Sequence, residues 1–311
     1  MSGKPENEIV VGTRGSLLAV AQTGWVIDEI RRHHPDLSVR SEHITTTGDR
    51  DQTAPLPEVG QKGIFTKELE EALLAGRIDL AVHSAKDLPE QMPAGLDLLC
   101  IPVREDPRDA LISRNGLTLE ELPAGAVIGT SSLRRQAQLR LIRPDLRFTV
   151  LRGNVDTRIR KVHTGDCDAT LLAMAGLNRV KMADQATCPL DIETIMPAPH
   201  QGILAVQGRT DDERMRRLLA PVENPESRLA FSVERSLVER LEGGCRTPIG
   251  LLAVVDAGHL SIAAVVAAPD GSRCARARAA GGRSQAGALA DRVLQELKAQ
   301  GAGEIIAACR V

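Results

Sequence analysis

The chain has 311 residues, of which 42% are hydrophobic, 26% are charged and only 1% are aromatic. Its 39 Lys and Arg nearly balance its 41 Asp and Glu, and this composition excludes collagen-like, coiled-coil and wholly disordered chains. No segment approaches the ~18 apolar residues that a membrane-spanning helix needs, and residues 1–8 are polar, so we expect a globular protein of the cytoplasm.

Strands and helices alternate along the first two thirds of the chain. Apolar runs predict strands at 9–11, 78–82, 127–129, 148–151 and 170–172. Five helices are predicted between and after these strands. One begins after Ser16, a second ends at Gly76, a third begins after the N-cap cluster Thr130–Ser132, a fourth begins after Asn154, and a fifth covers Ala173 to Arg179. This alternation predicts an α/β fold of parallel βαβ units, in which ligands bind beyond the carboxyl ends of the strands.

Polar residues gather at those predicted strand ends. They are Arg14 and Ser16, then 84–87, 130–135, 152–158 and Arg179. Capping and solvation account for any one of these positions, but five together predict one cleft lined by helix N-termini and guanidinium groups, which suits anions.

Positive charge is concentrated in one segment, since residues 134–161 hold nine cations against two acids. A solvated helix face is the ordinary explanation of such a run. Nucleic acid is another candidate ligand, but the chain offers only Trp25, Phe65, Phe148 and Phe231 for stacking, and its pI is about 6.4. A small polycarboxylate or a phosphorylated ligand fits these observations better.

The chain shows signs of division into lobes and of a different C-terminal part. Pro-rich junctions at 101–107 and 196–200 bracket a middle segment of about domain size, which suggests that the chain crosses into a second lobe and returns. After Pro225 we expect a helix over 228–241, a loop at 242–246, and a small α+β domain. Its later elements are two strands around the turn 256–258, a third apolar run at 273–279, and a helix from an N-cap at Ser284 to Gln300.

The six cysteines include no CxxC pair, so we expect neither a zinc site nor a disulfide framework. Cys245 follows two glycines and a helix end, which predicts an accessible thiol, and Arg246 beside it favours the thiolate. An inert buried thiol is the alternative for Cys245. For Asp87, which follows a strand and Lys86, the alternative is a surface ion pair or a turn cap.

Seven motifs occur in order along the chain: Gly12-Thr13-Arg14-Gly15-Ser16, Lys62 to Glu68, His83-Ser84-Ala85-Lys86-Asp87-Leu88-Pro89, Gly129 to Arg135, Arg152-Gly153-Asn154-Val155, Pro199-His200-Gln201-Gly202 and Leu241-Glu242-Gly243-Gly244-Cys245. Over residues 9–250 this set resembles the porphobilinogen deaminases, also called hydroxymethylbilane synthases. Members of that family condense four porphobilinogen molecules head to tail with loss of ammonia, and they release a linear hydroxymethylbilane. Porphobilinogen carries an acetate and a propionate, which would explain the excess of arginine.

The resemblance implies two lobes like those of type II periplasmic binding proteins and a third, small α+β domain. The expected boundaries are 1–102 with 200–221 for the first lobe, 103–199 for the second lobe, and 222–311 for the third domain. It also implies a dipyrromethane cofactor on a thioether to Cys245, a monomeric enzyme, and no role for nucleic acid, membrane or metal. The strongest rival is a non-catalytic, two-lobed anion- or solute-binding protein, to which Cys245 would be of no use.

Residue roles follow from the matched motifs. Asp87 is the expected catalytic carboxylate, and it would hold pyrrole N–H groups and stabilise the cation that forms as ammonia leaves. The expected cofactor-binding residues are Cys245, Lys86, Ser84, Asp87, Arg134, Arg135, Thr130 and Ser132. The expected substrate-binding residues are Arg14, Ser16, Arg152, Arg158, Arg179, Gln22, Asn154, Gln201, Phe65 and Lys62, with Lys62 inside a predicted lid at 49–63 and Phe65 just after it.

The chain departs from the family pattern at four positions. Glu58 stands where lysine or a neutral residue is frequent, His200 where glycine is common, Arg246 where glutamine is common, and Gln207 where glutamate is frequent. None of these changes removes an expected catalytic group, although Glu58 should weaken the attraction of the predicted lid for an acidic substrate.

Overall fold

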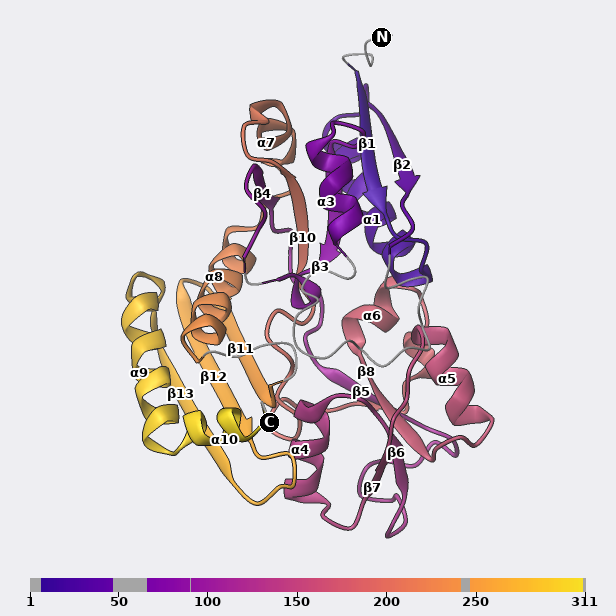
Figure 1. The fold of residues 1–311 in the computed structure, drawn as a ribbon, viewed down its shortest axis with the longest axis vertical. Helices are drawn as coiled ribbons and strands as arrows, with labels where there is room; N and C mark the ends of the chain where they lie inside the picture. The colour runs from indigo at the N-terminus through magenta and orange to yellow at the C-terminus, as the bar shows by residue number, and fades with distance from the viewer. Residues whose placement is uncertain (1–6, 47–65, 90, 242–246, 310–311) are drawn as a thin grey trace. The chain divides into compact units, whose positions relative to one another are not determined.

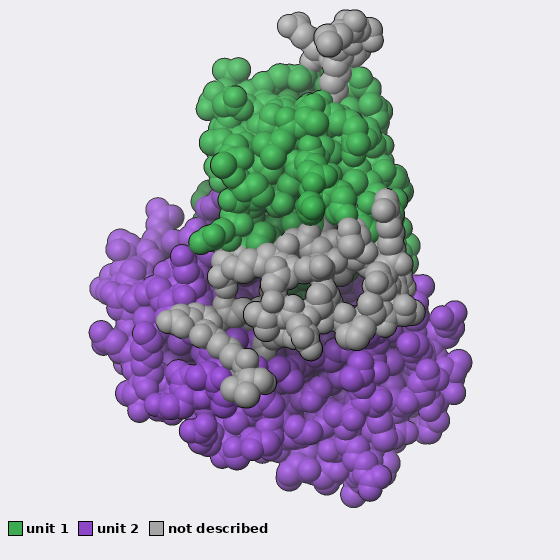
Figure 2. Space-filling view, in the orientation of Figure 1, with its two compact units in different colours: residues 1–103, 203–225 green, residues 104–202, 226–311 purple. Residues whose placement is uncertain are grey.

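The computed structural model describes residues 7–46, 66–89, 91–241 and 247–309. The chain divides into two compact units, coloured separately in Figure 2. Unit 1 comprises residues 1–103 and 203–225, and unit 2 comprises residues 104–202 and 226–311. Within the described residues, no helix combines the length and the hydropathy that crossing a membrane requires.

Unit 1 is built on a five-stranded sheet with the order β2-β1-β3-β10-β4. Strand β1 pairs in parallel with β2 and β3, whereas β10 runs antiparallel to β3 and β4. The elements of unit 1 in chain order are β1 (Glu8–Thr13), α1 (Leu17–His33), β2 (Ser38–His43), α3 (Lys67–Leu74), β3 (Leu80–Ser84), the 3-10 turn η1 (Ala85–Asp87), β4 (Leu96–Cys100), β10 (Leu204–Arg209) and α7 (Glu213–Leu219).

Helices cover both faces of this sheet. Alternate strand residues such as Val11 and Val82 pack with Val26 of α1, while Val10 and Ala81 pack on the other face with α3. Because side chains alternate between the two faces of a strand, this division follows from the run of apolar residues in β1 and β3.

Unit 2 contains a second five-stranded sheet with the order β7-β6-β8-β5-β9. Strand β6 is parallel to β7 and β8, and β5 is antiparallel to β8 and β9. The elements around this sheet are β5 (Asp109–Ser113), β6 (Val127–Gly129), α4 (Leu133–Ile142), β7 (Arg147–Thr149), α5 (Val155–His163), β8 (Ala169–Ala173), α6 (Met174–Arg179), the 3-10 turn η2 (Ala183–Gln185) and β9 (Cys188–Pro189).

The rest of unit 2 is an antiparallel three-stranded sheet, β11-β12-β13, beside which α9 and α10 lie in Figure 1. One face, including Ile262, packs against helices α8, α9 and α10, and the opposite face packs through Leu252 and Val265 against Ala137 of α4 and Met196. The elements are α8 (Pro225–Arg240), β11 (Ile249–Asp256), β12 (His259–Ala267), β13 (Cys274–Gly282), the 3-10 turn η3 (Arg283–Gln285), α9 (Ala286–Ala299) and α10 (Ala302–Ala308).

The predicted α/β class is confirmed: each unit holds a five-stranded sheet with helices, and a small α+β part with a three-stranded sheet lies at the C-terminal end of the chain. The expected parallel βαβ units are confirmed, since β1 pairs in parallel with β3, and β6 with β7 and β8. Two strands outside the predicted set, β10 and β5, enter their sheets antiparallel to a neighbour. The N-cap predicted at Ser284 is wrong. Residues 283–285 form η3 instead, and the Gln285 side chain accepts a hydrogen bond from Gly282 N at 3.0 Å.

Candidate functional site

In each unit, the residues predicted to bind or react lie where a strand ends and a turn or helix begins. In unit 1, Arg14 and Ser16 follow β1, and Ser84 to Asp87 complete β3 and form η1. In unit 2, residues 130–135 follow β6, Arg152 and Asn154 follow β7, and Arg179 ends the helix that follows β8. These edges expose helix N-termini, whose unpaired N–H groups favour anions.

At the end of β1, Ser16 acts as the N-cap of α1, and its hydroxyl accepts a hydrogen bond from Ala19 N at 3.3 Å. Arg14 lies half-buried between β1 and this cap. One turn and a half into α1, the buried Gln22 donates from Nε2 to the Ser84 hydroxyl at 2.8 Å. The ends of β1 and β3 are therefore joined by a side-chain hydrogen bond.

The turn η1 carries the predicted catalytic carboxylate. Ala85 N donates to Ile203 O at 3.0 Å, and Leu88 N closes the turn on Ala85 O at 3.3 Å. Lys86 is half-buried and Asp87 is exposed. Among the described residues, none forms a hydrogen bond or an ion pair with the Asp87 carboxylate. A turn anchored at both ends thus presents a carboxylate and an ammonium group side by side.

The strand that leads into this turn, β3, carries one end of a buried polar chain that sequence reasoning missed. His83 Nε2 forms a hydrogen bond with Gln207 Oε1 at 3.0 Å, and Gln207 Nε2 donates a hydrogen bond to Glu70 Oε1 at 3.3 Å. Burial, together with the charge of Arg14, lowers the pKa of His83 to about 4. The local signal was a histidine inside an apolar strand, and its partners come from distant parts of the chain.

The segment after β6 is organised by local caps. Thr130 is buried, and its hydroxyl accepts from Ser132 N at 3.1 Å. Ser132 is the N-cap of α4, and its hydroxyl accepts from Arg135 N at 3.4 Å. The N-cap predicted in this cluster is confirmed at Ser132.

Arg134 and Arg135 converge on one carboxylate, that of Asp109 in β5, which sequence reasoning missed. Arg134 Nη2 lies 2.8 Å from Asp109 Oδ2, and Arg135 Nη2 lies 2.7 Å from Oδ1. Each guanidinium also donates to a backbone carbonyl, Arg134 to Met196 O at 2.6 Å and Arg135 to Leu171 O at 2.7 Å. All three side chains are buried.

The charges of this cluster do not cancel. Burial opposes ionisation of Asp109, but the charges of Arg134 and Arg135 outweigh it and hold the pKa of Asp109 well below its usual range. Burial lowers the pKa of Arg134, and the Asp109 charge opposes that change. Because two guanidiniums share one carboxylate, this buried cluster carries one excess positive charge among the described residues.

Other predicted residues lie at neighbouring positions of unit 2. Gln201 is buried and donates to Asp109 Oδ1 at 2.9 Å, so it joins the same cluster. Arg179 donates to Gly202 O at 2.7 Å, and burial lowers its pKa to about 10. Arg158 donates to Gly153 O at 2.7 Å. Arg152 is half-buried, and Asn154 is an exposed N-cap residue of α5 without a side-chain cap bond.

Several predicted positions lie outside the described residues. These are Cys245, Lys62 and Phe65, together with Glu58, Arg246 and the whole of the predicted lid at 49–63.

A second buried carboxylate, Glu234 of α8, was also missed by sequence reasoning. Its Oε1 accepts from Arg104 Nη1 at 2.6 Å and from Ala253 N at 2.8 Å, and its Oε2 lies 3.4 Å from His200 Nδ1. Burial raises its pKa, but the Arg104 charge and His200 outweigh that effect and lower it to about 2. Glu234 therefore connects the chain at Arg104 and at His200 with α8 and β11 within unit 2.

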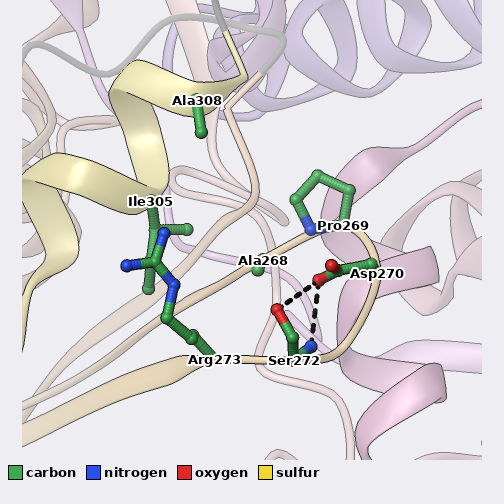
Figure 3. A pocket seen from close by; sticks show the side chains of 7 residues that line it. All are labelled: Ala268, Pro269, Asp270, Ser272, Arg273, Ile305 and Ala308. Atoms are coloured by element: carbon green, nitrogen blue, oxygen red, sulfur yellow. Dashed lines mark hydrogen bonds between the residues drawn. The ribbon is translucent and has the colours of Figure 1, made fainter.

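A pocket of about 290 Å³ lies at the β12–β13 loop and α10 of unit 2 (Figure 3). Asp270 in its wall accepts hydrogen bonds from Ser272 N at 2.9 Å and from the Ser272 hydroxyl at 2.7 Å. Its lining residues include Arg273 and Ile305, but none of the predicted site residues. This pocket is therefore separate from the strand ends described above.

Two family models match the chain. Residues 9–217 match the "Porphobilinogen deaminase, dipyromethane cofactor binding domain", and residues 229–299 match the "Porphobilinogen deaminase, C-terminal domain". A porphobilinogen deaminase of Desulforudis audaxviator (strain MP104C) is 48% identical over 303 residues, which cover 97% of this chain and 98% of the relative. A porphobilinogen deaminase of Roseiflexus castenholzii (strain DSM 13941 / HLO8) is 45% identical over 301 residues, 97% of this chain and 99% of the relative.

Among solved structures, the BenM effector binding domain with its effector benzoate is 15% identical, with a TM-score of 0.40 over 72% of this chain and 98% of that domain. At this level the likeness supports no statement about function. The sequence matches, in contrast, extend over both units and nearly the full length of the relatives. This chain belongs to the porphobilinogen deaminase family.

Proposed function

We propose that this protein is a transferase that condenses four porphobilinogen molecules head to tail, releases ammonia at each addition, and delivers linear hydroxymethylbilane to tetrapyrrole biosynthesis. The observation that carries the proposal is the placement of the matched polar residues at the ends of β1, β3, β6 and β7 and after β8. Each of these edges offers N–H, hydroxyl, ammonium or guanidinium donors, which are the groups that bind carboxylates. Each porphobilinogen brings two carboxylates.

Asp87 is the proposed catalytic residue. Loss of ammonia from porphobilinogen leaves a cation delocalised over the pyrrole ring, and an ionised carboxylate near the ring N–H stabilises that charge as it develops. Asp87 suits this role because η1 holds it in an exposed position and no described group neutralises it. A proton must reach the leaving amine, and another must later leave the attacked carbon.

The dipyrromethane that the family model names would be held by a thioether to Cys245, with Ser84, Lys86, Thr130, Ser132, Arg134 and Arg135 around its carboxylates. When bound, it supplies the first pyrrole carbon to which porphobilinogen is added. The donor set fits an acidic pyrrole. The excess positive charge of the Asp109 cluster is what one additional carboxylate would neutralise.

The remaining proposed roles concern substrate carboxylates, which Arg14, Ser16, Arg152, Arg158, Arg179, Gln22, Asn154 and Gln201 would bind, with Lys62 and Phe65 contributing from the predicted lid. Gln22, Ser16, Arg158 and Gln201 already make hydrogen bonds within their own unit. These bonds fix their positions, so the site would be organised before the substrate arrives.

A two-lobed anion-binding protein without catalysis is not favoured, because both family models are those of a deaminase. We further propose that the enzyme acts as a monomer in the cytoplasm, without nucleic acid or membrane as a partner. The near balance of charge and the scarcity of aromatic residues support the exclusion of nucleic acid.

The experiment that tests this function is an assay of purified protein with porphobilinogen, in which ammonia release and hydroxymethylbilane are both measured. Asp87→Asn preserves the shape of the side chain and removes its charge. We expect kcat to fall by about 100-fold to about 1,000-fold, the order lost when one group that stabilises developing charge is removed. Asp36→Asn, which alters another exposed carboxylate of unit 1, should leave kcat unchanged.

Ammonia release in step with hydroxymethylbilane by the wild-type protein would support the proposal. Tight binding of porphobilinogen without ammonia release would instead identify the non-catalytic binding protein. Near-normal turnover by Asp87→Asn would remove Asp87 from the mechanism.

A further inference from the structure

The buried chain of His83, Gln207 and Glu70 starts in β3, the strand that runs directly into the turn that carries Asp87. Its side chains come from β3, β10 and α3, and they are 6%, 0% and 8% exposed. The sheet register pairs Ala205 with His83 and Gln207 with Ala81, so both polar side chains lie on one face of the sheet. That face is the one that α3 covers.

The direction of the hydrogen bonds sets the tautomer of His83. The Glu70 carboxylate accepts from the Gln207 amide nitrogen at 3.3 Å, which leaves the Gln207 carbonyl oxygen facing the imidazole. A carbonyl oxygen only accepts, so His83 must donate from Nε2 at 3.0 Å. The imidazole therefore carries its proton on Nε2.

The surroundings of His83 also disfavour a second proton. Burial lowers its pKa to about 4, with the charge of Arg14 after β1 acting in the same direction and the hydrogen bond to Gln207 opposing it. Toward α3 the described partners are Gln207 of β10 and, through it, Glu70. Helix α1 covers the opposite face of the sheet, where Gln22 bonds to Ser84, and the chain continues into Lys86 and Asp87.

We propose that His83 is a positioning residue, kept neutral by its burial and fixed as the Nε2–H tautomer by Gln207 and Glu70, and that it fixes the end of β3 from which η1 presents Lys86 and Asp87. This inference rests on the proposed function, because the importance of the position comes from Asp87. Its consequence is a constant charge on this side of the site across the neutral pH range, since His83 neither gains nor loses a proton there.

The first test follows the His83 ring by NMR in the full-length protein, with its signal assigned by its absence in His83→Gln. In the wild-type protein we expect no titration between about pH 5.5 and about pH 8.5, where an unperturbed histidine changes charge. In Gln207→Glu, a carboxylate replaces the neutral amide beside the ring, and we expect the pKa of His83 to rise into that range. Titration of wild-type His83 near its ordinary value would overturn the proposal.

The second test compares kcat and KM for porphobilinogen. His83→Leu removes the donor and leaves the Gln207 oxygen buried without a partner, whereas His83→Gln can still donate an amide N–H from a similar position. For His83→Leu we expect kcat to fall between about 10-fold and about 100-fold with a small change in KM, the cost of a small displacement of a reacting group. His83→Gln should recover most of that loss.

His34→Gln is the matched control. His34 lies in the same unit, and its ring donates from Nε2 to Leu218 O at 2.9 Å, away from η1. It should retain the wild-type kcat. Gln207→Glu should add an acidic limb to the pH profile of kcat, at the pKa that the NMR titration gives for His83.

Two kinetic results would overturn the proposal: a wild-type kcat in folded His83→Leu, or an equal loss in His83→Gln and His83→Leu. Where His83→Leu does not fold, the pH profile of Gln207→Glu decides. Absence of porphobilinogen turnover in the wild-type protein would instead refute the proposed function, and the NMR titration would still decide the tautomer and charge of His83.

Discussion

Asp109 shows how one buried charge organises several predicted site residues. Its carboxylate accepts hydrogen bonds from Arg134, Arg135 and Gln201 while it is fully buried. Taking an ion out of water costs several kcal/mol, and the guanidiniums offset that cost only while the carboxylate is present. The positions of Arg134 and Arg135 therefore depend on Asp109, a strand residue that the sequence around it does not mark as their partner.

Replacement of Asp109 by Asn should consequently destabilise unit 2 strongly. It leaves two buried guanidiniums without a counter-charge, and we expect a loss of about 3–5 kcal/mol in the free energy of unfolding, the range for breaking a buried pair by removing one partner. Urea unfolding would measure it. The control is Asp106→Asn, which removes a partly exposed pair with Arg108 and should cost no more than about 1 kcal/mol. Equal effects of the two variants would contradict this assignment.

The stability of the protein should fall in acid in two windows. The pKa of His83 is about 4 in the folded state against 6.5 ordinarily, so the unfolded state binds the proton first as pH falls from 6.5 to about 4. The pKa of Glu234 is about 2 against 4.5, so its contribution is present above pH 4.5 and is lost as pH falls towards 2. Both effects lower stability with decreasing pH.

Thermal unfolding midpoints measured across this pH range would test the assignment. His83→Gln should flatten the decline in the upper window, and Glu234→Gln should flatten it in the lower window. A wild-type midpoint that does not change between pH 6.5 and pH 4 would contradict the buried neutral state of His83.

Among the elements, the N-terminus of α4 combines a structural and a proposed binding role in Ser132. Its hydroxyl caps the helix at Arg135 N, and the same group is a proposed cofactor contact. Ser132→Ala should cost about 1 kcal/mol of stability, the usual cost of losing such a cap. Ser132→Asp keeps a capping oxygen but adds a negative charge, so it should keep the stability and weaken the binding of acidic pyrroles.

Thermal midpoints and KM for porphobilinogen, measured on both variants, would separate the two roles. An unchanged KM in Ser132→Asp would mean that Ser132 only caps the helix.

Most elements were predictable because their signals are local. Ser16 and Ser132 cap α1 and α4 as expected, and Asp256 to Gly258 connect β11 to β12. Strands β5 and β10 were not predicted to be antiparallel, because strand direction depends on where the chain returns to a sheet. Ser284 was misassigned because a 3-10 turn, with Gln285 reaching back to Gly282 N, precedes the helix.

The candidate site was predictable where its signals are local, and it was not predictable where it depends on partners distant in the sequence. Motifs locate Asp87, Arg134 and Arg135 at strand ends, because those residues follow strand patterns in the sequence. Asp109 holds Arg134 and Arg135, His83 is the proposed support of the turn that carries Asp87, and Glu234 joins Arg104 and His200 to β11. Each is a charged or titratable residue in an otherwise ordinary segment, and its importance appears only when the fold brings together partners that lie 19 to 130 residues away.

At the scale of the whole molecule, unit 2 contains two sheets, and the contact between their parts combines apolar packing with hydrogen bonds and an ion pair. Ala137 and Met196 pack on Leu252 and Val265, Arg140 donates to Pro269 O, and Arg278 pairs with Glu193. We retain as a proposal that the chain has three domains, with the boundaries expected from its sequence, and that the domain at 222–311 carries the cofactor.

The measurement that tests this account most directly is the intact mass of the purified protein, followed by peptide mapping. We predict a mass above that of the unmodified chain by two linked pyrrole units, located on the peptide that contains Cys245 and absent from Cys245→Ser. An unmodified protein that gains this increment on incubation with porphobilinogen would be the apoenzyme. An unmodified mass that does not change on that incubation would contradict the account.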